Sequence, residues 1–366
     1  MNIAIVFGGK SVEHDVSIVT AKQIYNISKS MYNIKLVYVD KQGNFNLYTN
    51  SKFDFVDFKT TNKNLVPITF NNGSIYKKSV FGFKKQDKID CAIMCTHGGN
   101  GENGTITSYL ISCGIPVTAG SSLALGISMN KWLSKQFFKA NNMPFVKGLY
   151  ADKNTDIDIL NKKIEKSFGY PVIVKANGGG SSIGIKTATN KQELINALKV
   201  ALEFDYSAVV EQELTDFTEY NCAVFGDEQN MQISNIDEPI RQQEILSFAD
   251  KYLHGGGKNK KGSLKTQARV YPNMQEDLKQ KIQKIAKQIF VKLGFYGVVR
   301  IDFIYCTKTN KIYVNEINAI PGSLANYYFA TTLLQQNLFI EKLVQIGIKN
   351  YQKTTNININ YITKLF

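Results

Sequence analysis

The stretch Tyr313-Val-Asn-Glu-Ile-Asn-Ala-Ile-Pro-Gly322 predicts a strand that carries polar groups on one face. The residues around its start alternate polar side chains with β-branched or aromatic ones, which is typical of a strand. Glu316 and Asn318 are two residues apart, so on a strand both side chains point to the same face. Arg300 and Asp302 repeat this spacing just upstream. Either pair alone would favour a plain β-hairpin with a polar solvent face, but both pairs together favour a functional site.

The four polar side chains suit a magnesium–phosphate site. Asp302, Glu316 and Asn318 offer two carboxylates and one amide oxygen, and an all-oxygen set of this kind suits Mg²⁺ that bridges substrate phosphates. Arg300 beside them supplies fixed positive charge where negative charge develops in a reaction. The sequence therefore predicts a metal site with an arginine next to it.

The composition indicates a globular protein of more than one domain. The chain has 366 residues, of which 43% are hydrophobic, so two or three domains with sizeable cores are expected. The formal charge of +14 could indicate nucleic-acid binding, but the lysines are scattered among asparagines and form no arginine-rich stripes. The one dense basic run, residues 258–265, contains Gly262 and follows three glycines at 255–257, and it would suit a polyphosphate as well as a nucleic acid. We therefore expect no nucleic-acid partner.

The cysteines and the apolar stretches predict a cytoplasmic protein that does not bind membranes. Cys91 and Cys95 lie in one apolar run, and the other three cysteines also have aliphatic or aromatic neighbours. The chain has no Cys-x-x-Cys spacing, and it does not open with a basic segment followed by a long apolar one. Its apolar stretches are all shorter than the ~18 residues that a membrane span needs. These features favour buried thiols in a reducing compartment.

Strands, glycine turns and helices alternate through the first third of the chain. Apolar runs predict strands at residues 2–7, 34–39, 89–94 and 115–118. Helical apolar spacing predicts helices at residues 16–25 and 105–112. This pattern is typical of a small α/β domain with a mainly parallel, Rossmann-like sheet. It puts Glu13 and His97 at the carboxyl ends of strands, where such sheets bind ligands. Residues 41–88 are turn-rich and polar and give no prediction.

The rest of the chain predicts two further regions and a tail. A helix over residues 130–141 leads into a second region, with strands at 170–175 and 209–213 and a helix at 191–204. The third region has predicted strands near 220–225, 266–270, 298–304 and 312–316, and a long helix over 275–293. The asparagine-rich tail from residue 350 is expected to be peripheral.

An early glycine turn fits the relaxed P-loop pattern but is too short to act as one. Residues 4–11 read Ala-Ile-Val-Phe-Gly-Gly-Lys-Ser, between a predicted strand and a predicted helix. A P-loop needs its four variable residues in the loop, so that successive N–H groups wrap the phosphates. Here three of those residues belong to the strand. A P-loop nucleotide switch therefore stays a remote alternative.

A second glycine-rich loop is better placed to bind phosphate. Residues 172–185 predict a strand, a flexible polar loop and a second strand. Three consecutive glycines let the backbone close over phosphates, two serines add hydroxyls, and Lys175 at the strand end can reach a phosphate oxygen. Some thirty residues later an apolar strand runs into acidic residues 211–213, a composition expected where a segment meets adenine and ribose. The sequence therefore predicts a nucleotide lid rather than a floppy hairpin.

Seven short motifs follow one another along almost the whole chain. They are Phe7-Gly-Gly-Lys-Ser-Val-Glu-His-Asp-Val-Ser17, His97-Gly-Gly-Asn-Gly-Glu-Asn-Gly-Thr-Ile106, Ser128-Met-Asn-Lys131, Pro171-Val-Ile-Val-Lys175 with Gly180-Ser-Ser-Ile-Gly184, Asp250-Lys-Tyr252, Arg300-Ile-Asp302, and Asn315-Glu-Ile-Asn318 with Pro321-Gly322. In this order they resemble the D-alanine–D-alanine ligases of the ATP-grasp superfamily, from about Met1 to about Ile346. The resemblance implies an α/β, three-domain ATP-grasp architecture with ATP between the central and C-terminal domains. It also implies two Mg²⁺ ions, with Mn²⁺ as a substitute, and a homodimer.

The resemblance implies a nucleotide-binding role for ten residues. Lys131 and Lys175 would hold ATP phosphates, Lys251 would approach the γ-phosphate, Glu211 with the backbone of Gln212 and Leu214 would meet adenine, Glu219 would bind the ribose, and Asp302, Glu316 and Asn318 would bind Mg²⁺.

The resemblance also implies residues that bind the amino acids and take part in the reaction. Glu13 would receive the ammonium of the first D-alanine with His97 nearby, Arg300 and the N–H of Gly322 would stabilise the oxyanion, and Ser181 and Tyr252 would link the glycine loop, the ω-loop and Glu13 into a closed lid.

The sequence departs from the family at two positions. Tyr327 stands where family members carry a serine for the carboxylate of the second substrate, so the pocket must be reshaped around a tyrosine hydroxyl. Asn103 stands where Asp is usual, and we expect little effect. Tyr252 matches the peptide-forming members of the family and not the lactate-using ones.

The resemblance leads to predictions for the domains and for the reaction. We predict a substrate-binding domain at 1–120, a central ATP-grasp domain at 121–215, a C-terminal catalytic domain at 216–346 and a peripheral tail at 347–366. The expected reaction is ATP-dependent formation of D-alanyl-D-alanine for peptidoglycan, through an acyl phosphate. Ligation of D-alanine to D-serine or to another D-amino acid is the alternative.

Overall fold

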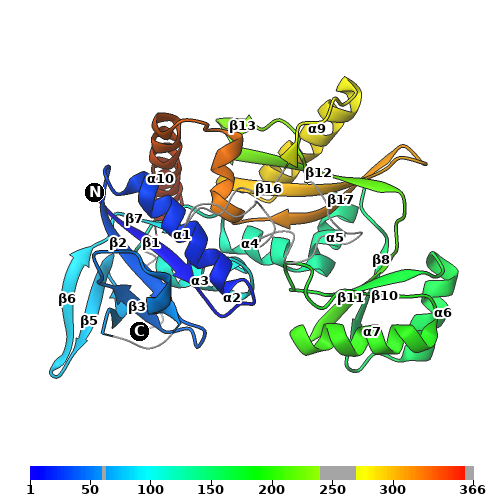
Figure 1. The fold of residues 1–366 in the computed structure, drawn as a ribbon, viewed down its shortest axis with the longest axis horizontal. Coiled ribbons are helices and arrows are strands. Elements are labelled where there is room, and N and C mark those ends of the chain that lie inside the picture. The colour runs from blue at the N-terminus through cyan, green and yellow to red at the C-terminus, as the bar shows by residue number, and fades with distance from the viewer. Residues whose placement is uncertain (60–62, 240–268, 359–366) are drawn as a thin grey trace, which may run out of the picture.

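The computed structural model describes residues 1–59, 63–239 and 269–358. Figure 1 shows an elongated molecule with the N-terminal part at one end and a small sheet with two helices at the other. A third sheet, formed by the C-terminal part of the chain, lies between them. This order puts the C-terminal sheet in contact with both neighbours, where a site shared by all three can form.

The N-terminal sheet has seven strands in the order β6-β5-β4-β3-β2-β1-β7. Three strands are parallel, as predicted, namely β1 (Asn2–Gly8), β2 (Asn33–Val39) and β7 (Cys91–Met94). Four antiparallel strands extend the sheet over the stretch without a prediction, namely β3 (Phe45–Tyr48), β4 (Leu65–Asn71), β5 (Ser74–Ser79) and β6 (Gly82–Lys88). A short 3₁₀ turn, η1 (Phe55–Phe58), follows β3. The predicted strand at 115–118 is reduced to one parallel bridge between Val117 and Ala92.

The helix α1 (His14–Ser28) packs on the parallel part of this sheet. Three further helices follow β7 in the chain, namely α2 (Gly99–Glu102), α3 (Thr105–Ser112) and α4 (Ser122–Met129). The predicted helix at 105–112 is confirmed, and the one at 16–25 lies inside α1. Ala21 and Ile24 of α1 are fully buried with Ile3 and Ile5 of β1, because the helical spacing puts its apolar residues on one face. The turns after β1 and β7 are thereby fixed at one edge of the sheet.

The central part is a four-stranded antiparallel sheet, in the order β10-β9-β11-β8. Its strands are β8 (Gly148–Asp152), β9 (Val172–Ala176), β10 (Lys186–Ala188) and β11 (Ser207–Gln212). Its helices are α6 (Ile157–Ser167) and α7 (Lys191–Phe204), preceded by α5 (Lys131–Ala140). The predicted helix at 191–204 and the antiparallel strands around the glycine loop are confirmed. This part has a hydrophobic core of its own, separate from that of the rest of the molecule.

The C-terminal sheet has the order β13-β12-β16-β17. Its strands are β12 (Phe217–Gly226), β13 (Met231–Ile233), β16 (Gly297–Cys306) and β17 (Lys311–Asn318), and a small pair is formed by β14 (Glu238–Pro239) and β15 (Arg269–Val270). The helical segments are α9 (Glu276–Lys292), the 3₁₀ segment η2 (Gly322–Tyr328) and α10 (Leu333–Thr355). Of the predicted strand at 266–270, residues 266–268 lie outside the described residues.

The helix α10 runs beyond the predicted start of the tail. It begins at a capping box on Thr332 and continues through Thr355, so residues 347–355 are helical. Gly347 lies so close to the N-terminal part that a Cβ atom there would be 2.6 Å from the Val117 carbonyl oxygen. Within the described parts of the chain, no helix is long and apolar enough to cross a membrane.

The C-terminal sheet and the N-terminal part pack into one continuous hydrophobic core. Gly297, at the start of β16, has a φ of +86°, and a Cβ atom there would be 2.2 Å from the Thr118 carbonyl oxygen. Only glycine fits this close backbone approach. On its other side the C-terminal sheet meets the segment before β8, where the Val314 N–H donates to the Pro144 carbonyl at 2.9 Å. The strands β16 and β17 are therefore held against both neighbours.

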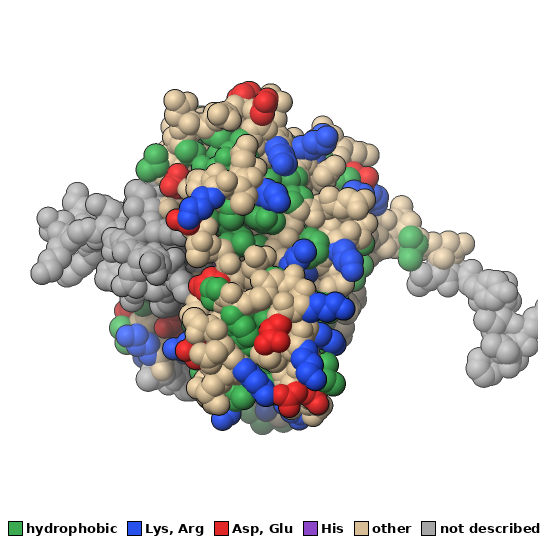
Figure 2. All heavy atoms as spheres, turned by 90° about the vertical axis from the view of Figure 1, so that its right-hand side faces the viewer, with side chains coloured by type: hydrophobic (Ala, Val, Ile, Leu, Met, Phe, Trp, Pro, Cys, Tyr) green, Lys and Arg blue, Asp and Glu red, His purple; other side chains and the backbone are tan. Residues whose placement is uncertain are grey.

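The charged side chains form no continuous basic stripe on the face in Figure 2. The lysines and arginines on that face, which looks onto the central part, are interspersed with acidic, apolar and other side chains. A long groove of one charge sign is the usual footprint of nucleic-acid binding.

Candidate active site

One pocket gathers side chains from all three parts of the molecule. Fifteen of the predicted site residues line it, namely Glu13, His97, Lys131, Lys175, Ser181, Glu211, Gln212, Leu214, Glu219, Arg300, Asp302, Glu316, Asn318, Gly322 and Tyr327. The other two, Lys251 and Tyr252, lie outside the described residues. The structure thus brings together every predicted site residue that it describes, from segments far apart in the sequence.

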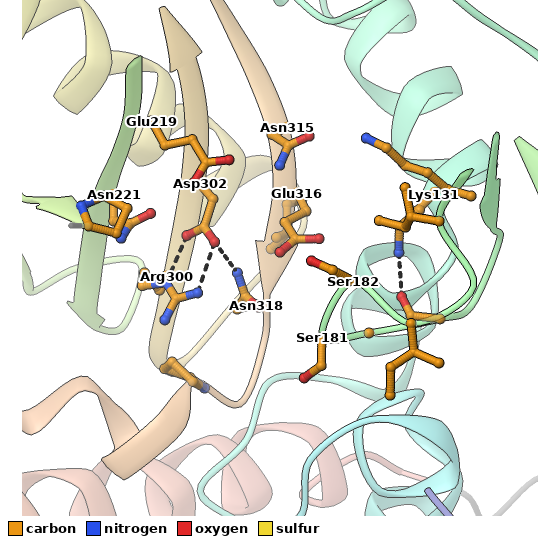
Figure 3. A pocket seen from close by; sticks show the side chains of 18 of the residues that line it. Lys131, Ser181, Ser182, Glu219, Asn221, Arg300, Asp302, Asn315, Glu316 and Asn318 are labelled. Atoms are coloured by element: carbon orange, nitrogen blue, oxygen red, sulfur yellow. Dashed lines mark hydrogen bonds and ion pairs between the residues drawn. The ribbon is translucent and has the colours of Figure 1, made fainter. Parts of the chain in front are cut away.

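The polar face of β16 and β17 forms as the residue spacing predicts. Arg300 pairs across the sheet with Asn318, and Asp302 pairs with Glu316. The Arg300 guanidinium donates to both Asp302 carboxylate oxygens, at 2.7 and 2.8 Å, and the Asn318 amide nitrogen donates to Asp302 at 3.0 Å (Figure 3). Burial alone would lower the pKa of Arg300, but the adjacent Asp302 carboxylate outweighs it and raises the pKa above its usual value. The arginine is therefore a fixed positive charge in the pocket.

A β-bulge in β17 adds a polar side chain that the two-residue spacing does not predict. Asp302 pairs with Glu316 while Phe303 pairs with Val314, so Asn315 is left over between them. A bulge redirects the side chains next to it. Asn315 and Glu316 consequently both line the pocket, although they are neighbours in sequence (Figure 3). The sequence carries no clear signal for this bulge.

The glycine loop between β9 and β10 reaches across the pocket to α1. The Ser181 hydroxyl donates to the carboxylate of Glu13, the residue just before α1. Ser181 and Ser182 adopt positive φ values of 53° and 60°, which turn the loop over the pocket. The Glu13 carboxylate is enclosed so closely that a Cβ atom on Gly180 would be 2.6 Å from Glu13 Oε2. Glu13 thus lies where the lid, the N-terminal part and the pocket meet.

Two buried side chains hold the peptide groups of Ile320, two residues before Gly322. The His97 Nδ1–H donates to the Ile320 carbonyl at 2.8 Å, and the Ile320 N–H donates to Glu102 Oε1 at 3.1 Å. Because Nδ1 carries the proton, His97 Nε2 accepts from the Thr20 hydroxyl, at 2.8 Å. Burial lowers the pKa of His97 to about 4, so the ring stays neutral at pH 7. His97 therefore fixes the loop that carries Gly322, besides lining the pocket.

Glu102 belongs to the motif at residues 97–106 but has no predicted role. Burial and the nearby Glu13 carboxylate raise its pKa to about 7, while the backbone N–H groups of Gly98 and Ile320 oppose this rise. Its Oε2 accepts from the Gly98 N–H at 3.0 Å. Glu102 therefore ties the turn after β7 to the loop before Gly322.

Two lysines line the central side of the pocket, and a third lies behind them. The Lys131 ammonium donates to the Gly179 carbonyl in the glycine loop (Figure 3), and the Lys175 ammonium is 2.7 Å from Glu211 Oε2. A third lysine, Lys135, is 3.0 Å from Glu211 Oε1. Burial would raise the pKa of Glu211, but Lys135 and Lys175 outweigh it and lower the pKa to about 2. Lys135, which contacts Glu211 together with Lys175, belongs to none of the quoted motifs.

The segment after Gly322 places one tyrosine in the pocket and one behind it. Tyr327 is half-buried and lines the pocket, and its ring centroid is 4.7 Å from that of Tyr328. The Tyr328 hydroxyl donates to Asp237, outside the pocket lining. Of the two tyrosines, Tyr327 is the one that can meet a bound substrate.

Comparison with known proteins identifies the family. Residues 2–120 match the family described as D-ala D-ala ligase N-terminus, and residues 137–349 match the one described as D-ala D-ala ligase C-terminus. The second match alone covers more than half of the chain. The chain belongs to the D-ala D-ala ligase family. The predicted resemblance is therefore confirmed.

Individual relatives agree with this assignment along nearly their full length. The chain is 33% identical over 369 residues to the D-alanine–D-alanine ligase of Thermosipho melanesiensis, covering 98% of this chain and 97% of the relative. The crystal structure of the D-alanine–D-alanine ligase from Helicobacter pylori superposes with a TM-score of 0.76 at 27% identity, covering 94% and 98% of the two chains. The VanG D-Ala:D-Ser ligase from Enterococcus faecalis gives 0.74 at 26%, covering 96% and 99%. The predicted ATP-grasp architecture of this ligase-family chain is thereby confirmed.

The buried His97 leads to a prediction about acid stability. Its pKa of about 4 lies below the usual 6.5, so between these pH values the unfolded chain binds a proton that the folded chain does not. The stability that depends on neutral His97 is complete above pH 6.5 and is lost as the pH falls towards 4. His97→Asn keeps a donor for the Ile320 carbonyl but cannot titrate. Between pH 7 and pH 4.5 we expect the wild type to lose roughly 2–3 kcal/mol more unfolding free energy than this variant.

Urea unfolding of both proteins at the two pH values measures this difference. His14, which is also buried with a lowered pKa, is common to both proteins and cancels. A stability difference that does not change with pH would show that His97 is not held neutral by its surroundings.

Proposed function

We propose that this chain is an ATP-dependent ligase that joins two D-alanines into D-alanyl-D-alanine for peptidoglycan. The observation that carries the proposal is the arrangement of opposite charges across one pocket. Arg300, Asp302 and Glu316 lie on the C-terminal sheet, and Lys131 and Lys175 lie opposite, beside the glycine loop. A bound triphosphate needs positive charge around its phosphates and a loop that closes over them. Lys131 and Lys175 would supply that charge on one side, and Mg²⁺ held by the carboxylates would supply it on the other.

The nucleotide and the metal have fitting residues in the pocket. Asp302, Glu316 and Asn318 offer two carboxylates and an amide oxygen, and Mg²⁺ is commonly bound by one or two carboxylates together with substrate phosphates. These three residues would hold two Mg²⁺ ions, or Mn²⁺, which would offset the charge of the phosphates. Lys131 and Lys175 would hold phosphate oxygens, Glu211 with Gln212 and Leu214 would meet adenine, and Glu219 would bind the ribose. Lys251 would approach the γ-phosphate.

The reaction follows from the weak reactivity of a carboxylate towards an amine. The carboxylate of the first D-alanine attacks the γ-phosphorus of ATP, and the bond to the β–γ bridging oxygen breaks, which gives an acyl phosphate and ADP. The amine of the second D-alanine then attacks the acyl carbon, loses a proton, and expels phosphate. The oxyanion of this step would lie between the Arg300 guanidinium and the Gly322 N–H.

The first D-alanine would be held by Glu13 and covered by the glycine loop. The Glu13 carboxylate would accept from the substrate ammonium while Ser181 anchors the loop to the same carboxylate. Tyr252 would extend this contact to the ω-loop. Because acyl phosphates hydrolyse readily, a loop that excludes water is part of the mechanism. We further propose that the enzyme is cytoplasmic and acts as a homodimer without a nucleic-acid or membrane partner.

ADP release from the purified chain tests the proposal. With MgATP, ADP formation should require D-alanine, should not occur with L-alanine, and should be accompanied by a product with the mass of a D-alanyl dipeptide. A screen of D-serine and other D-amino acids as partners of D-alanine identifies the second substrate. D-serine used in preference to D-alanine would replace the dipeptide assignment by the alternative. ADP release that is independent of every D-amino acid would overturn the ligase and favour a nucleotide switch.

Tyr327 gives a prediction about the second substrate. If its hydroxyl holds the carboxylate of the second D-alanine, Tyr327→Phe removes a hydrogen bond to a charged group, worth ~1.5–3 kcal/mol. We expect the Michaelis constant of the second D-alanine site to rise by ~10-fold or more, with the first site and ATP nearly unchanged. Tyr328→Phe is the matched control, because the Tyr328 hydroxyl bonds to Asp237 outside the pocket. An unchanged second-site constant together with a lowered melting temperature would make Tyr327 a packing residue.

A further inference from the structure

Lys135 lies behind the wall of the pocket and not in it. The pocket lining includes Lys131 and Lys175 but not Lys135. Its ammonium is 3.0 Å from Glu211 Oε1 and donates to the Val146 carbonyl at 2.8 Å. The side chains of Lys135 and Glu211 are each only 5% exposed. A bound ligand would therefore not reach Lys135, although it would meet the carboxylate that Lys135 holds.

The two oxygens of Glu211 are shared between a hidden lysine and an accessible one. Lys175 is 2.7 Å from Oε2, is 12% exposed and lines the pocket. Both lysines are fixed by local structure. Lys135 follows Lys131 by one turn on the same face of α5, and Lys175 and Glu211 come from the paired strands β9 and β11. A ligand in the pocket can therefore compete with Glu211 for Lys175 but not for Lys135.

The charges explain why two lysines serve one carboxylate. Lys175 is placed to bind a phosphate oxygen, but in this structure its ammonium points at Glu211. If Lys175 turned to a phosphate and Glu211 had no second partner, a buried carboxylate would lose its counter-charge. Breaking a buried ion pair in this way is strongly unfavourable. Lys135 provides Glu211 with a second counter-charge, because its contact with Glu211 does not depend on the ligand.

We propose that Lys135 is a positioning residue that keeps the Glu211 carboxylate ionised and fixed, so that Lys175 can pass from Glu211 to a nucleotide phosphate. The proposal rests on the ATP-dependent function proposed above and adds a residue to it. It also predicts which nucleotide base the pocket prefers. An ionised carboxylate only accepts hydrogen bonds, so Glu211 held by Lys135 favours a base with an amino group at position 6 over one with a carbonyl there.

Nucleotide binding by Lys135→Met tests the proposal. We expect the dissociation constant of MgATP, measured by titration calorimetry without D-alanine, to rise by about tenfold or more, because Glu211 then retains Lys175. The preference for MgATP over MgITP, whose base carries the carbonyl, should fall in the same variant. In steady-state assays the Michaelis constant for D-alanine should change less than about twofold. Lys139→Met is the matched control, one turn further along α5, exposed and outside the pocket, and it should leave both nucleotide constants unchanged.

The variant Glu211→Gln separates charge compensation from packing. Glutamine keeps an acceptor but does not need a counter-charge, so Lys135→Met in this background should change MgATP affinity by less than about threefold. If Lys135→Met alone does not fold, MgATP affinity can still be compared between Glu211→Gln and the double variant. An equal loss of affinity in both backgrounds, no loss in either, or an unfolded double variant would each overturn the role of Lys135.

These outcomes are independent of the ligase reaction. A wild-type chain that binds MgATP but releases no ADP with D-alanine would contradict the proposed function. The effect of Lys135 on nucleotide affinity would still be measured in that protein. A wild-type chain that binds no MgATP would overturn both the inference and the function on which it rests.

Discussion

Replacing Arg300 by methionine is expected to cut the turnover number by ~10²-fold or more, because a group that stabilises an oxyanion acts mainly in the transition state. Arg300 is the basic residue of β16, and it lines the same pocket as Gly322. Methionine has a similar length and no charge. Binding of MgATP in the absence of D-alanine should stay within about threefold of the wild type, because the lysines across the pocket are unchanged.

The structure adds a control to this experiment. Arg300 makes two hydrogen bonds to Asp302, so the substitution removes both of them, while the Asn318 amide still donates to that carboxylate. Arg300→Met should therefore be compared with Arg300→Lys, which keeps a positive charge but not the two parallel bonds. Melting temperatures of both variants show whether the fold is intact. Wild-type turnover in a folded Arg300→Met protein would show that Arg300 does not stabilise the oxyanion.

Features of the site that depend on local periodicity could be predicted from the sequence. The spacing of Arg300 with Asp302 and of Glu316 with Asn318 fixes which face of a strand they share, and the structure pairs them across β16 and β17. The helix at 191–204 is confirmed with its full length, because its apolar spacing and the Asn190 cap are both local signals. The glycine loop follows from its composition in the same way.

Features that depend on distant contacts could not be predicted. The strand β6 is exposed along almost its whole length, so no apolar alternation marks it in the sequence. The stretch 115–118 looks apolar enough for a strand, but only Val117 forms a bridge to its neighbour, Ala92. Lys135 and Glu102 acquire their roles only through Glu211 and Ile320, which are 76 and 218 residues away in the chain.

Substitution of Glu13 is expected to change the Michaelis constant of D-alanine much more than that of ATP. Its carboxylate is buried between the backbone of Gly98 and that of Gly180 and is contacted by the Ser181 hydroxyl. It does not cap α1 through its side chain, so a role limited to the helix end would be worth only ~0.3–1 kcal/mol. If the carboxylate instead binds the ammonium of the first D-alanine, Glu13→Gln should raise the Michaelis constant of that site by ~10-fold or more. The constant for ATP should change far less.

The matched control for Glu13→Gln is Asp15→Asn, on the first turn of the same helix. Asp15 is exposed and does not line the pocket, so its substitution removes the same charge from the same helix end without touching the substrate. We expect Asp15→Asn to leave both Michaelis constants within about twofold of the wild type, because a helix-end charge acts on stability and not on one substrate. Equal increases for D-alanine and ATP in Glu13→Gln would indicate that Glu13 only anchors the Ser181 loop. Selective loss of D-alanine, with Asp15→Asn unaffected, would assign the ammonium to Glu13.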